Sequence, residues 1–309
     1  MSTVSSMIRR VVWSRTLFEF WQRLGIHVTR SDYSSPIPDT RELGRRESFW
    51  AGEPSFAGID LNAETQLHFL REVFPEYKDE LAFPTDPTGD THQFHLNNSA
   101  FGLEDASVYH CMVRHFKPRT IIEVGAGNST LVSTRACRMN EKEGHPGKVL
   151  AVEPYPRKYL KKGLPGLERL IARGVELVEP QFFEQLDEND ILFIDSSHVF
   201  RIANDVHFLY LEILPRLKKG VTVHVHDIFS PYHYPRRGVV EKQVFWTEQY
   251  LLQAFLCLNR SFEVLFANHY MSAKHGDEMH AFFPYPPGYR RQWSSPNGDA
   301  RSFWFRRVT

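Results

Sequence analysis

The chain has 309 residues, of which 42% are hydrophobic and 24% are charged. This composition is typical of a globular protein with a large buried core and excludes a disordered or fibrous chain. Lysine plus arginine and aspartate plus glutamate both number 37, so no net charge attracts nucleic acid or an anionic membrane. We therefore expect a small-molecule partner and no nucleic acid.

The three cysteines, Cys111, Cys137 and Cys257, lie far apart and lack the spacing of metal ligands or of a disulfide framework. This pattern favours a reducing compartment. No run approaches the roughly 18 to 20 apolar residues of a membrane-spanning helix, and residues 1–21 lack the apolar core of a signal peptide. The sequence thus predicts a cytoplasmic protein, and it leaves open whether the chain forms a homo-oligomer.

The first thirty residues predict an amphipathic helix, because arginines alternate with large apolar side chains. The arginines are Arg9, Arg10, Arg15, Arg23 and Arg30. We favour a helix that packs on its own domain or on a partner subunit. The alternative is a helix that makes a weak peripheral contact with a membrane. An irregular stretch follows over residues 31–60, and Leu67, Leu70 and Phe74 predict a second helix. Residues 1–93 are therefore expected to form a helical cap with an irregular wrap.

From residue 120 onward, short apolar runs alternate with helical segments, which predicts a parallel sheet. Strands are expected at residues 120–124, 149–152, 175–178, 191–194, 221–225, 262–266 and 302–306. The last run follows a proline-rich stretch and is expected to enter antiparallel. A helix after the fourth strand should end at Gly220. Its predicted inward face comprises Ile202, Val206, Leu209, Ile213, Leu214 and Leu217.

A glycine turn follows the first strand. Gly125 and Gly127 leave room for a ligand beside the backbone, and the helix that begins near Ser129 points free N–H groups toward it. Ser129 stands where a dinucleotide site usually has a third glycine, and Glu123 before the turn can accept a hydrogen bond from an ammonium group. Both features favour a sulfonium amino acid over a pyrophosphate. The predicted cofactor-binding residues of this turn are Glu123, Gly125, Ala126, Gly127, Asn128 and Ser129.

Further polar residues follow the second, fourth and fifth strands. Glu153, followed by Pro154, stands where two ribose hydroxyls would lie, and both are predicted to bind the cofactor. Residues 97–102 either close this site from the cap side or form a simple turn. In an open α/β sheet the strand ends share one rim. We therefore expect one pocket to be faced by Asp195, His198, His226 and Asp227.

Together these motifs resemble class I S-adenosylmethionine-dependent methyltransferases, in particular a bacterial-type small-molecule branch (Methyltransferase-24-like). The resemblance covers residues 94–309 and an upstream segment. It rests on the glycine turn and on YSSPIPDTREL (33–43), VEPYP (152–156), FIDSSH (193–198), HVHDIF (224–229) and SFWFRR (302–307). It implies a Rossmann-like α/β fold with a seven-stranded, mostly parallel sheet and an antiparallel last strand. It also implies S-adenosylmethionine as cofactor, with methyl transfer to a hydroxyl or carboxyl oxygen of a small molecule.

Methyl transfer from a sulfonium is an in-line displacement that depends mainly on positioning, and a base is needed only when the acceptor must lose a proton. His198 or His226 is the predicted base. Asp195 and Asp227 would orient an imidazole or the cofactor. Asp195 is thus predicted to be both a catalytic and a cofactor-binding residue. A metal-assisted reaction is the alternative. We rank it lower and predict no metal, because Ile228 stands where another oxygen ligand is expected.

Residues 230–237 and 245–250 are rich in aromatic and cationic side chains and follow the fifth strand. The predicted substrate residues are Tyr232, Arg236, Trp246 and Tyr250. Arg236 or its neighbour could hold a carboxylate, and core packing is the equal alternative for the aromatic residues. Two other functions stay open, an NAD-dependent oxidoreductase and a non-catalytic adenosyl-binding scaffold. The sequence does not choose the acceptor.

Overall fold

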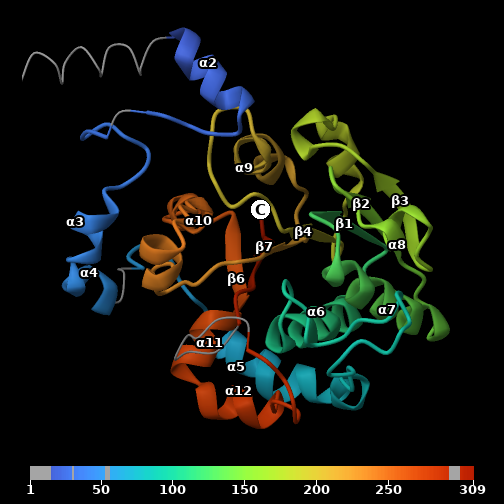
Figure 1. Ribbon diagram of the computed structural model, residues 1–309. Coiled ribbons are helices and arrows are strands. Elements are labelled where there is room, and N and C mark those ends of the chain that lie inside the picture. Colours follow the sequence, from blue (N-terminus) through green and yellow to red (C-terminus); the bar gives the residue numbers. More distant parts are fainter. Residues whose placement is uncertain (1–14, 30, 53–55, 292–299) are drawn as a thin grey trace, which may run out of the picture. The chain divides into compact units, whose positions relative to one another are not determined.

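The computed structural model describes residues 15–29, 31–52, 56–291 and 300–309 (Figure 1). Two compact units make up the chain. One comprises Met1–Ala51 with Arg236–Phe245, and the other comprises Gly52–Pro235 with Trp246–Thr309. The domain boundary expected at residue 93 stays a prediction, and the compact units divide after Ala51. No helix among the described residues is both long and apolar enough to cross a membrane.

The smaller unit is helical. Its elements are α2 (Arg15–Arg23), α3 (Thr40–Gly44), α4 (Glu47–Ala51) and the π-helical turn η7 (Arg237–Glu241). The carboxylate of Asp39 caps α3 by accepting hydrogen bonds from the backbone N–H groups of Arg41 and Glu42. A helix is thus present in the part of the predicted N-terminal helix that the structure describes. Arg9, Arg10 and Arg30 lie outside the described residues.

The larger unit is built on a seven-stranded sheet of order β3-β2-β1-β4-β5-β7-β6. The strands are β1 (Thr120–Val124), β2 (Lys148–Val152), β3 (Leu167–Ile171), β4 (Ile191–Ile194), β5 (Thr222–Val225), β6 (Phe262–Ala267) and β7 (Phe303–Arg307). Strand β7 runs antiparallel to both β5 and β6, whereas β1 to β5 pair in parallel. The predicted seven-stranded fold with an antiparallel last strand is therefore confirmed.

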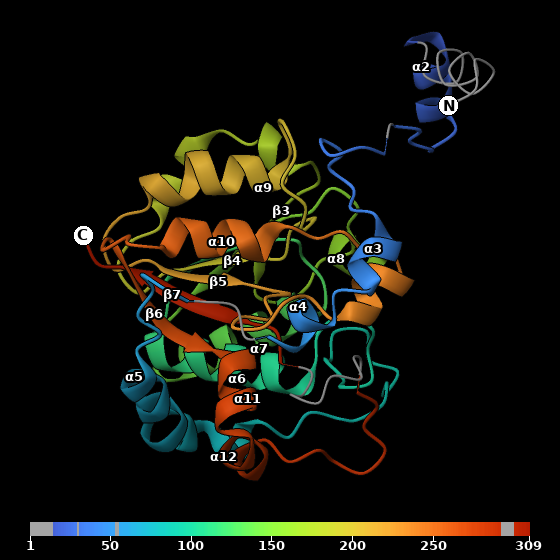
Figure 2. The same ribbon diagram turned by 90° about the vertical axis from the view of Figure 1, so that its left-hand side faces the viewer.

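Helices cover both faces of this sheet (Figure 2). Ile121 belongs to the apolar core on one face and Ile122 to the core on the other, as the alternation of side chains along a strand requires. The first core also includes residues of α6 (Leu103–Phe116), α7 (Asn128–Lys142), α8 (Lys158–Lys161), α11 (Asn268–Lys274) and α12 (Gly276–Phe282). The second includes residues of α9 (Asp205–Phe208) and α10 (Glu248–Leu256).

The third strand was predicted in the wrong place. Residues 175–178 were expected to form it, but Val175–Leu177 is the 3-10 turn η3, and β3 lies at Leu167–Ile171. Strand β3 is at the edge of the sheet and its residues are only half-buried or exposed. An edge strand therefore needs no continuous apolar run. Val175 and Val178, in contrast, are apolar and buried but lie outside any strand.

The helix predicted around Leu67 and the helix predicted after the fourth strand are both present, each as a run that changes helical type. The first comprises α5 (Ala63–His68), η1 (Phe69–Val73) and η2 (Phe74–Glu80), and the second comprises α9, η5 (Leu209–Ile213) and η6 (Leu214–Arg216). A further 3-10 turn, η4, covers Pro180–Gln185. The expected inward residues of the second run are buried except Ile202, which is 96% exposed. That assignment was wrong because the helix begins only after its cap, Asn204, whose side chain accepts a hydrogen bond from the backbone of His207.

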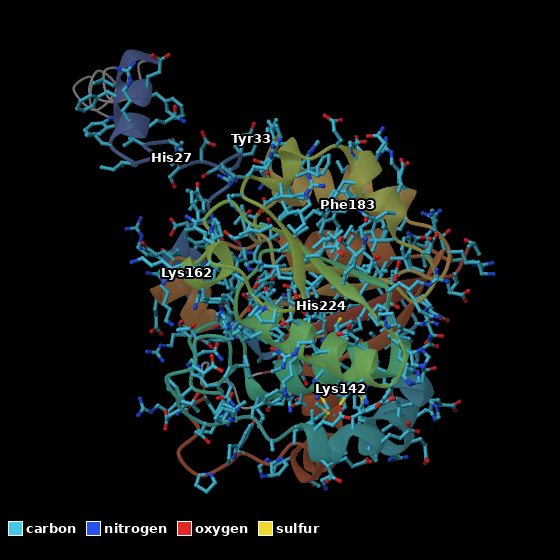
Figure 3. All side chains as sticks on the ribbon, turned by 90° about the vertical axis from the view of Figure 1, so that its right-hand side faces the viewer. His27, Tyr33, Lys142, Lys162, Phe183 and His224 are labelled. Atoms are coloured by element: carbon cyan, nitrogen blue, oxygen red, sulfur yellow. The ribbon has the colours of Figure 1, made fainter. Side chains whose placement is uncertain are left out.

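The centre of the sheet is aromatic. Trp304 of β7 is fully buried, and its ring lies 4.6 Å from that of His224, which in turn stacks on Phe193 at 4.2 Å. Figure 3 shows His224 among the packed side chains of the interior. Its Nε2 atom is 2.7 Å from the hydroxyl of Ser302. His224 is therefore a hydrogen-bonded core residue.

Replacing Trp304 with alanine should reduce the free energy of unfolding by about 3–5 kcal/mol, because loss of the large fully buried ring would leave a cavity in the core on that face of the sheet. The Ile202→Ala control should change it by less than about 0.5 kcal/mol, since that side chain is exposed. Urea unfolding followed by circular dichroism measures both. Equal losses in the two variants would contradict this account of the core.

Candidate functional site

A cavity of about 300 Å³ opens where β1, β2 and β4 end. It is lined by Ala100, Phe101, Gly125, Ala126, Gly127, Asn128, Ser129, Glu153, Tyr155, Arg157, Asp195 and Ser196. All predicted cofactor-binding residues except Glu123 and Pro154 are in this set. The structure therefore brings them to one place, and their binding of a cofactor stays a prediction.

Gly125 and Gly127 differ in what surrounds them. Gly125 has a φ of +86°, and a Cβ atom there would lie 1.9 Å from the backbone oxygen of Asp195. The fold itself therefore excludes any side chain at this position. A Cβ atom on Gly127 would meet no atom within 4 Å. Gly127 lines the cavity, so the space beside it is room for a ligand.

Residues 97–102 close one side of the cavity. The side chain of Asn98 accepts hydrogen bonds from the backbone N–H groups of Ala100 and Phe101, which both line the cavity. The same amide oxygen accepts a hydrogen bond of 2.8 Å from Asn128 on the first turn of α7. Of the two interpretations of this segment, the structure thus supports closure of the site.

Glu123 does not line the cavity, contrary to its predicted contact with an ammonium group. Its side chain is fully buried, and its carboxylate accepts hydrogen bonds from the hydroxyls of Tyr109 at 2.8 Å, Ser133 at 2.7 Å and Thr130 at 2.6 Å. Burial raises the pKa of Glu123, although these hydroxyls oppose that rise. The residue instead fastens α6 and α7 to the end of β1.

Glu153 lies in the cavity wall, as predicted. It is half-buried, and its Oε1 atom accepts a hydrogen bond of 2.7 Å from the backbone N–H of Tyr155. Burial raises the pKa of its carboxyl group. Tyr155, Arg157 and Ser196 also line the cavity. The sequence analysis missed them, although their closeness in sequence to Glu153 and Asp195 was an available signal.

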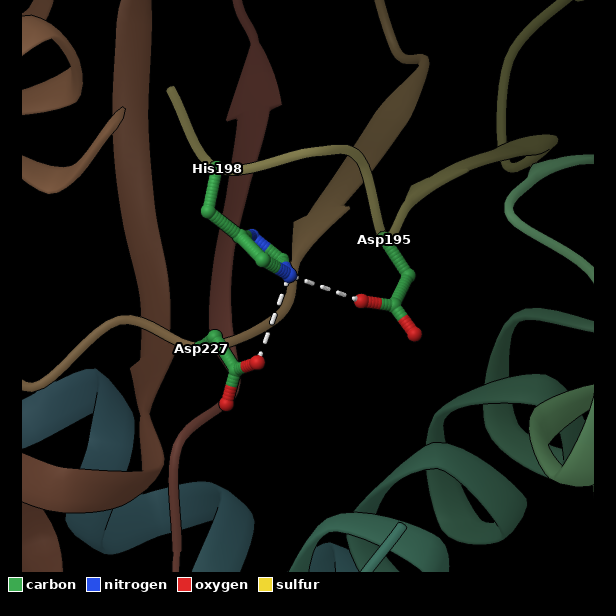
Figure 4. A group of neighbouring side chains, drawn as sticks. All are labelled: Asp195, His198 and Asp227. Atoms are coloured by element: carbon green, nitrogen blue, oxygen red, sulfur yellow. Dashed lines mark ion pairs between the residues drawn. The ribbon is translucent and has the colours of Figure 1, made fainter. Parts of the chain in front are cut away.

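The four predicted rim residues lie together, and Figure 4 shows three of them, Asp195, His198 and Asp227. The Nε2 atom of His198 is 3.3 Å from Oδ1 of Asp195 and 3.3 Å from Oδ2 of Asp227. The Nδ1 atom of His226 is 3.3 Å from the same oxygen of Asp195. Only Asp195 of the four lines the cavity, and its side chain keeps 30% of its surface exposed.

Three further charged residues complete this cluster and were missed. The Nδ1 atom of His198 is 2.9 Å from the carboxylate of Glu248 on α10. The Nε2 atom of His226 is 3.4 Å from the carboxylate of Asp105 on α6. Arg301, which precedes β7, donates a hydrogen bond of 2.6 Å to Asp227. No local pattern in the sequence marks these partners, because each comes from a distant segment.

The carboxylates keep both imidazoles protonated. Burial alone would lower the pKa of each ring, but the surrounding carboxylates outweigh it. They raise the pKa of His198 well above its usual range and that of His226 to about 9. The same pairs hold the pKa of Asp195 well below its usual range. At neutral pH, therefore, each imidazole is protonated on both ring nitrogens, and both nitrogens point toward carboxylates.

Asp195, His198 and Asp227 also form a candidate cation-binding group, since one ligand atom from each lies within 4.8 Å of the others. In the structure, protein side chains supply the positive charge that lies beside these carboxylates. His198 lies between the two carboxylates, and Arg301 pairs with Asp227. To bind a metal ion, His198 would first have to lose its proton. The predicted absence of a metal stays a prediction.

Of the predicted substrate residues, Tyr232, Trp246 and Tyr250 belong to the larger unit and Arg236 belongs to the smaller one. The ring of Trp246 lies 4.6 Å from that of His198, and Tyr234 contacts the rings of both Trp246 and Tyr250 at 5.7 Å. Tyr232 packs against another ring, that of His269, at 5.7 Å. Arg236 belongs to the smaller unit, where its guanidinium donates a hydrogen bond of 2.9 Å to the backbone oxygen of Gly44.

Comparison with known proteins gives matches over the larger unit. Residues 122–228 match a family model described as a methyltransferase domain. An uncharacterized protein from Archaeoglobus fulgidus is 34% identical over 166 residues, which are 52% of this chain and 73% of that protein.

Solved structures also give matches. The O-methyltransferase TomG from Streptomyces achromogenes, involved in tomaymycin synthesis and solved with S-adenosylmethionine, has 14% identity and a TM-score of 0.41, covering 69% of this chain and 83% of its own. An O-methyltransferase from Bacillus cereus, solved with S-adenosylhomocysteine, has 14% identity and a TM-score of 0.35, covering 81% and 98%.

The protonated His226 should make stability depend on pH. Its pKa rises from 6.5 to about 9 on folding, so its contribution is complete below pH 6.5 and is lost as the pH rises through 9. This contribution is on the order of 3 kcal/mol. The free energy of unfolding should therefore fall between pH 6.5 and 9.5 in the natural protein.

The His226→Asn variant should be less stable at pH 6.5 and should show a flatter decline, when urea unfolding is measured across this pH range. His198 still titrates in that variant, so some decline is expected. The same decline in both proteins would assign the effect to groups other than His226.

Proposed function

Because the chain belongs to the class I S-adenosylmethionine-dependent methyltransferase family, we propose that it transfers a methyl group from this cofactor to an oxygen atom of a small molecule. The observation that carries the proposal is the cavity at the ends of β1, β2 and β4. There the glycine turn, Glu153 and Asp195 meet beside a buried cluster of charged side chains.

Residues of the cavity wall would hold the cofactor. Glu153 would accept hydrogen bonds from the ribose hydroxyls, as carboxylates after the second strand do in sheets of this type. Gly127 leaves the backbone open to the ligand, and α7 begins at Asn128, so its first N–H groups can face a ligand carboxylate. When bound, S-adenosylmethionine supplies a methyl group on a positively charged sulfur.

Oxygen is the proposed acceptor atom because the carboxylate of Asp195, the one predicted rim residue that lines the cavity, can accept a hydrogen bond from an acceptor hydroxyl. His198, His226 and Arg301 surround the carboxylates of Asp195 and Asp227. The two histidines hold the pKa of Asp195 well below its usual range, so its ionised carboxylate can orient the hydroxyl oxygen toward the methyl group. We propose that the cavity and the adjacent ring of Trp246 bring such an oxygen in line with the methyl group.

The role of the histidines is best described as positioning. Each ring directs both nitrogens toward carboxylates and retains its proton at neutral pH. Either ring would have to release that proton before it could act as the predicted base. We propose that His198 and His226 keep Asp195 ionised and hold Asp195 and Asp227 in place. A carboxylate acceptor would need no base at all.

The proposal has three further parts, which concern the cell compartment, the acceptor side of the site and the N-terminal helix. We place the protein in the cytoplasm, on the basis of its widely spaced cysteines. Tyr232, Trp246 and Tyr250 would line the acceptor side. The helix over residues 15–23 would serve in a homo-oligomer or in a weak peripheral contact.

Calorimetry with S-adenosylhomocysteine and with NAD tests the cofactor. We expect one molecule of S-adenosylhomocysteine to bind per chain, and tight binding of NAD alone would overturn the proposal in favour of an oxidoreductase. Transfer of labelled methyl groups to a panel of hydroxy and carboxy acids should then identify the acceptor. Firm cofactor binding without transfer to any oxygen, nitrogen or carbon acceptor would favour a scaffold.

The two glycines of the turn provide a sharper test. Gly127→Ala should fold normally, because a Cβ atom there meets no protein atom, but should weaken S-adenosylhomocysteine binding by about tenfold or more through lost ligand space. Gly125→Ala should destabilise the fold itself, because its Cβ atom collides with Asp195. Thermal unfolding and calorimetry separate the two effects. Unchanged binding by Gly127→Ala would place the ligand elsewhere.

We also propose that the reaction requires no metal, since His198 and Arg301 supply positive charge beside Asp227. Methyl transfer should persist in the presence of a chelator, and the purified protein should contain much less than one equivalent of divalent metal. Loss of transfer on chelation, with recovery on adding magnesium or manganese, would instead establish the metal-assisted reaction.

A further inference from the structure

We propose that Glu248 is a positioning residue whose one buried carboxylate ties the cofactor cavity to the acceptor side of the site. The proposal rests on the methyltransferase function proposed above and adds a coupling between its two halves. Glu248 does not line the cavity, so any effect on ligands must pass through the residues that it holds.

One oxygen atom of Glu248 makes both contacts. Its Oε2 accepts a hydrogen bond of 2.8 Å from the hydroxyl of Ser196, which lines the cavity. The same oxygen lies 2.9 Å from Nδ1 of His198, whose ring packs against Trp246. The side chain of Glu248 is fully buried. A movement of this oxygen would therefore displace residues on both sides together.

The backbone at the start of α10 reinforces this link. The carbonyl of His198 accepts hydrogen bonds from the backbone N–H groups of Thr247 at 2.8 Å and Glu248 at 3.1 Å. The backbone N–H of Phe200 donates to the hydroxyl of Thr247 at 2.8 Å. His198 has a φ of +61°, which is unfavourable for a residue with a side chain. These contacts hold the loop after β4 in that conformation.

The consequence extends to the cavity wall. With its Nδ1 atom held by Glu248, the ring of His198 directs Nε2 to Asp195 and Asp227 at 3.3 Å each. Asp195 and Ser196 are adjacent in the loop and both line the cavity. Two sites that share one such element are expected to influence each other's ligand affinity.

A double-mutant cycle between Glu248→Gln and Ser196→Ala tests the link by S-adenosylhomocysteine calorimetry, which needs no acceptor. Glutamine keeps the size and one acceptor oxygen but removes the charge. Glu248→Gln should weaken binding by about tenfold, the loss expected for one charge-assisted hydrogen bond. The double variant should bind no more weakly than the weaker single variant, because both changes break the same contact. Glu248→Asp should recover part of the lost affinity.

Asp190→Asn is the matched control. This carboxylate is also buried, but it precedes β4 and accepts hydrogen bonds from the backbone N–H groups of Thr120 and Asp187, away from the cavity. It should lower stability, leave S-adenosylhomocysteine affinity within about twofold of the natural protein, and add independently to Ser196→Ala. Natural affinity in Glu248→Gln, or additive effects with Ser196→Ala, would overturn the proposed link.

The ring of His198 gives a readout that does not depend on the cofactor. Its imidazole NMR signals in the free protein should shift in Glu248→Gln and stay unchanged in Asp190→Asn. Failure of the natural protein to bind S-adenosylhomocysteine would refute the proposed function, whereas unchanged His198 signals in Glu248→Gln would refute the link itself. If Glu248→Gln does not fold, Glu248→Asp replaces it in both measurements, with smaller shifts expected and the same criteria.

Discussion

The site depends on the pairing of charges that the fold has taken out of water. Asp105, Asp195, Asp227 and Glu248 approach His198, His226 and Arg301 at the ends of β4 and β5. An isolated buried charge is costly, and removing one member of such a pair commonly costs about 3–5 kcal/mol. Each member of the cluster therefore constrains the others, and the rim of the sheet has little freedom to rearrange.

This constraint also explains why the pKa values of His198 and His226 are raised, whereas that of His224 in β5 is lowered. His224 is fully buried among aromatic rings, and burial lowers its pKa well below the usual range. His226 is equally buried but faces Asp195 and Asp105, which reverse the shift. His224 in β5 and His226 just after this strand thus hold opposite protonation states at neutral pH, because carboxylates contact only His226.

The sequence predicted the features that depend on local pattern. Strand β4 is a continuous apolar run, and the rim position of Asp195 and Asp227 follows from the direction of parallel strands. Strand β3 was misplaced because an edge strand buries little of its surface. Glu123 was assigned to the ligand because position in a motif does not reveal the direction of a side chain. Asp105, Glu248 and Arg301 were missed because only the tertiary fold brings them to the cluster.

The antiparallel direction of β7 has a consequence for how the site is assembled. Because β7 runs opposite to its neighbours, its beginning lies at the rim where the parallel strands end. Arg301 and Ser302 therefore reach Asp105, although 196 positions separate Arg301 from that residue. During synthesis, Arg301 emerges long after Asp105 and Asp227, so these carboxylates lack one of their partners until then. The charged cluster is therefore complete only after the last strand of the chain has joined the sheet.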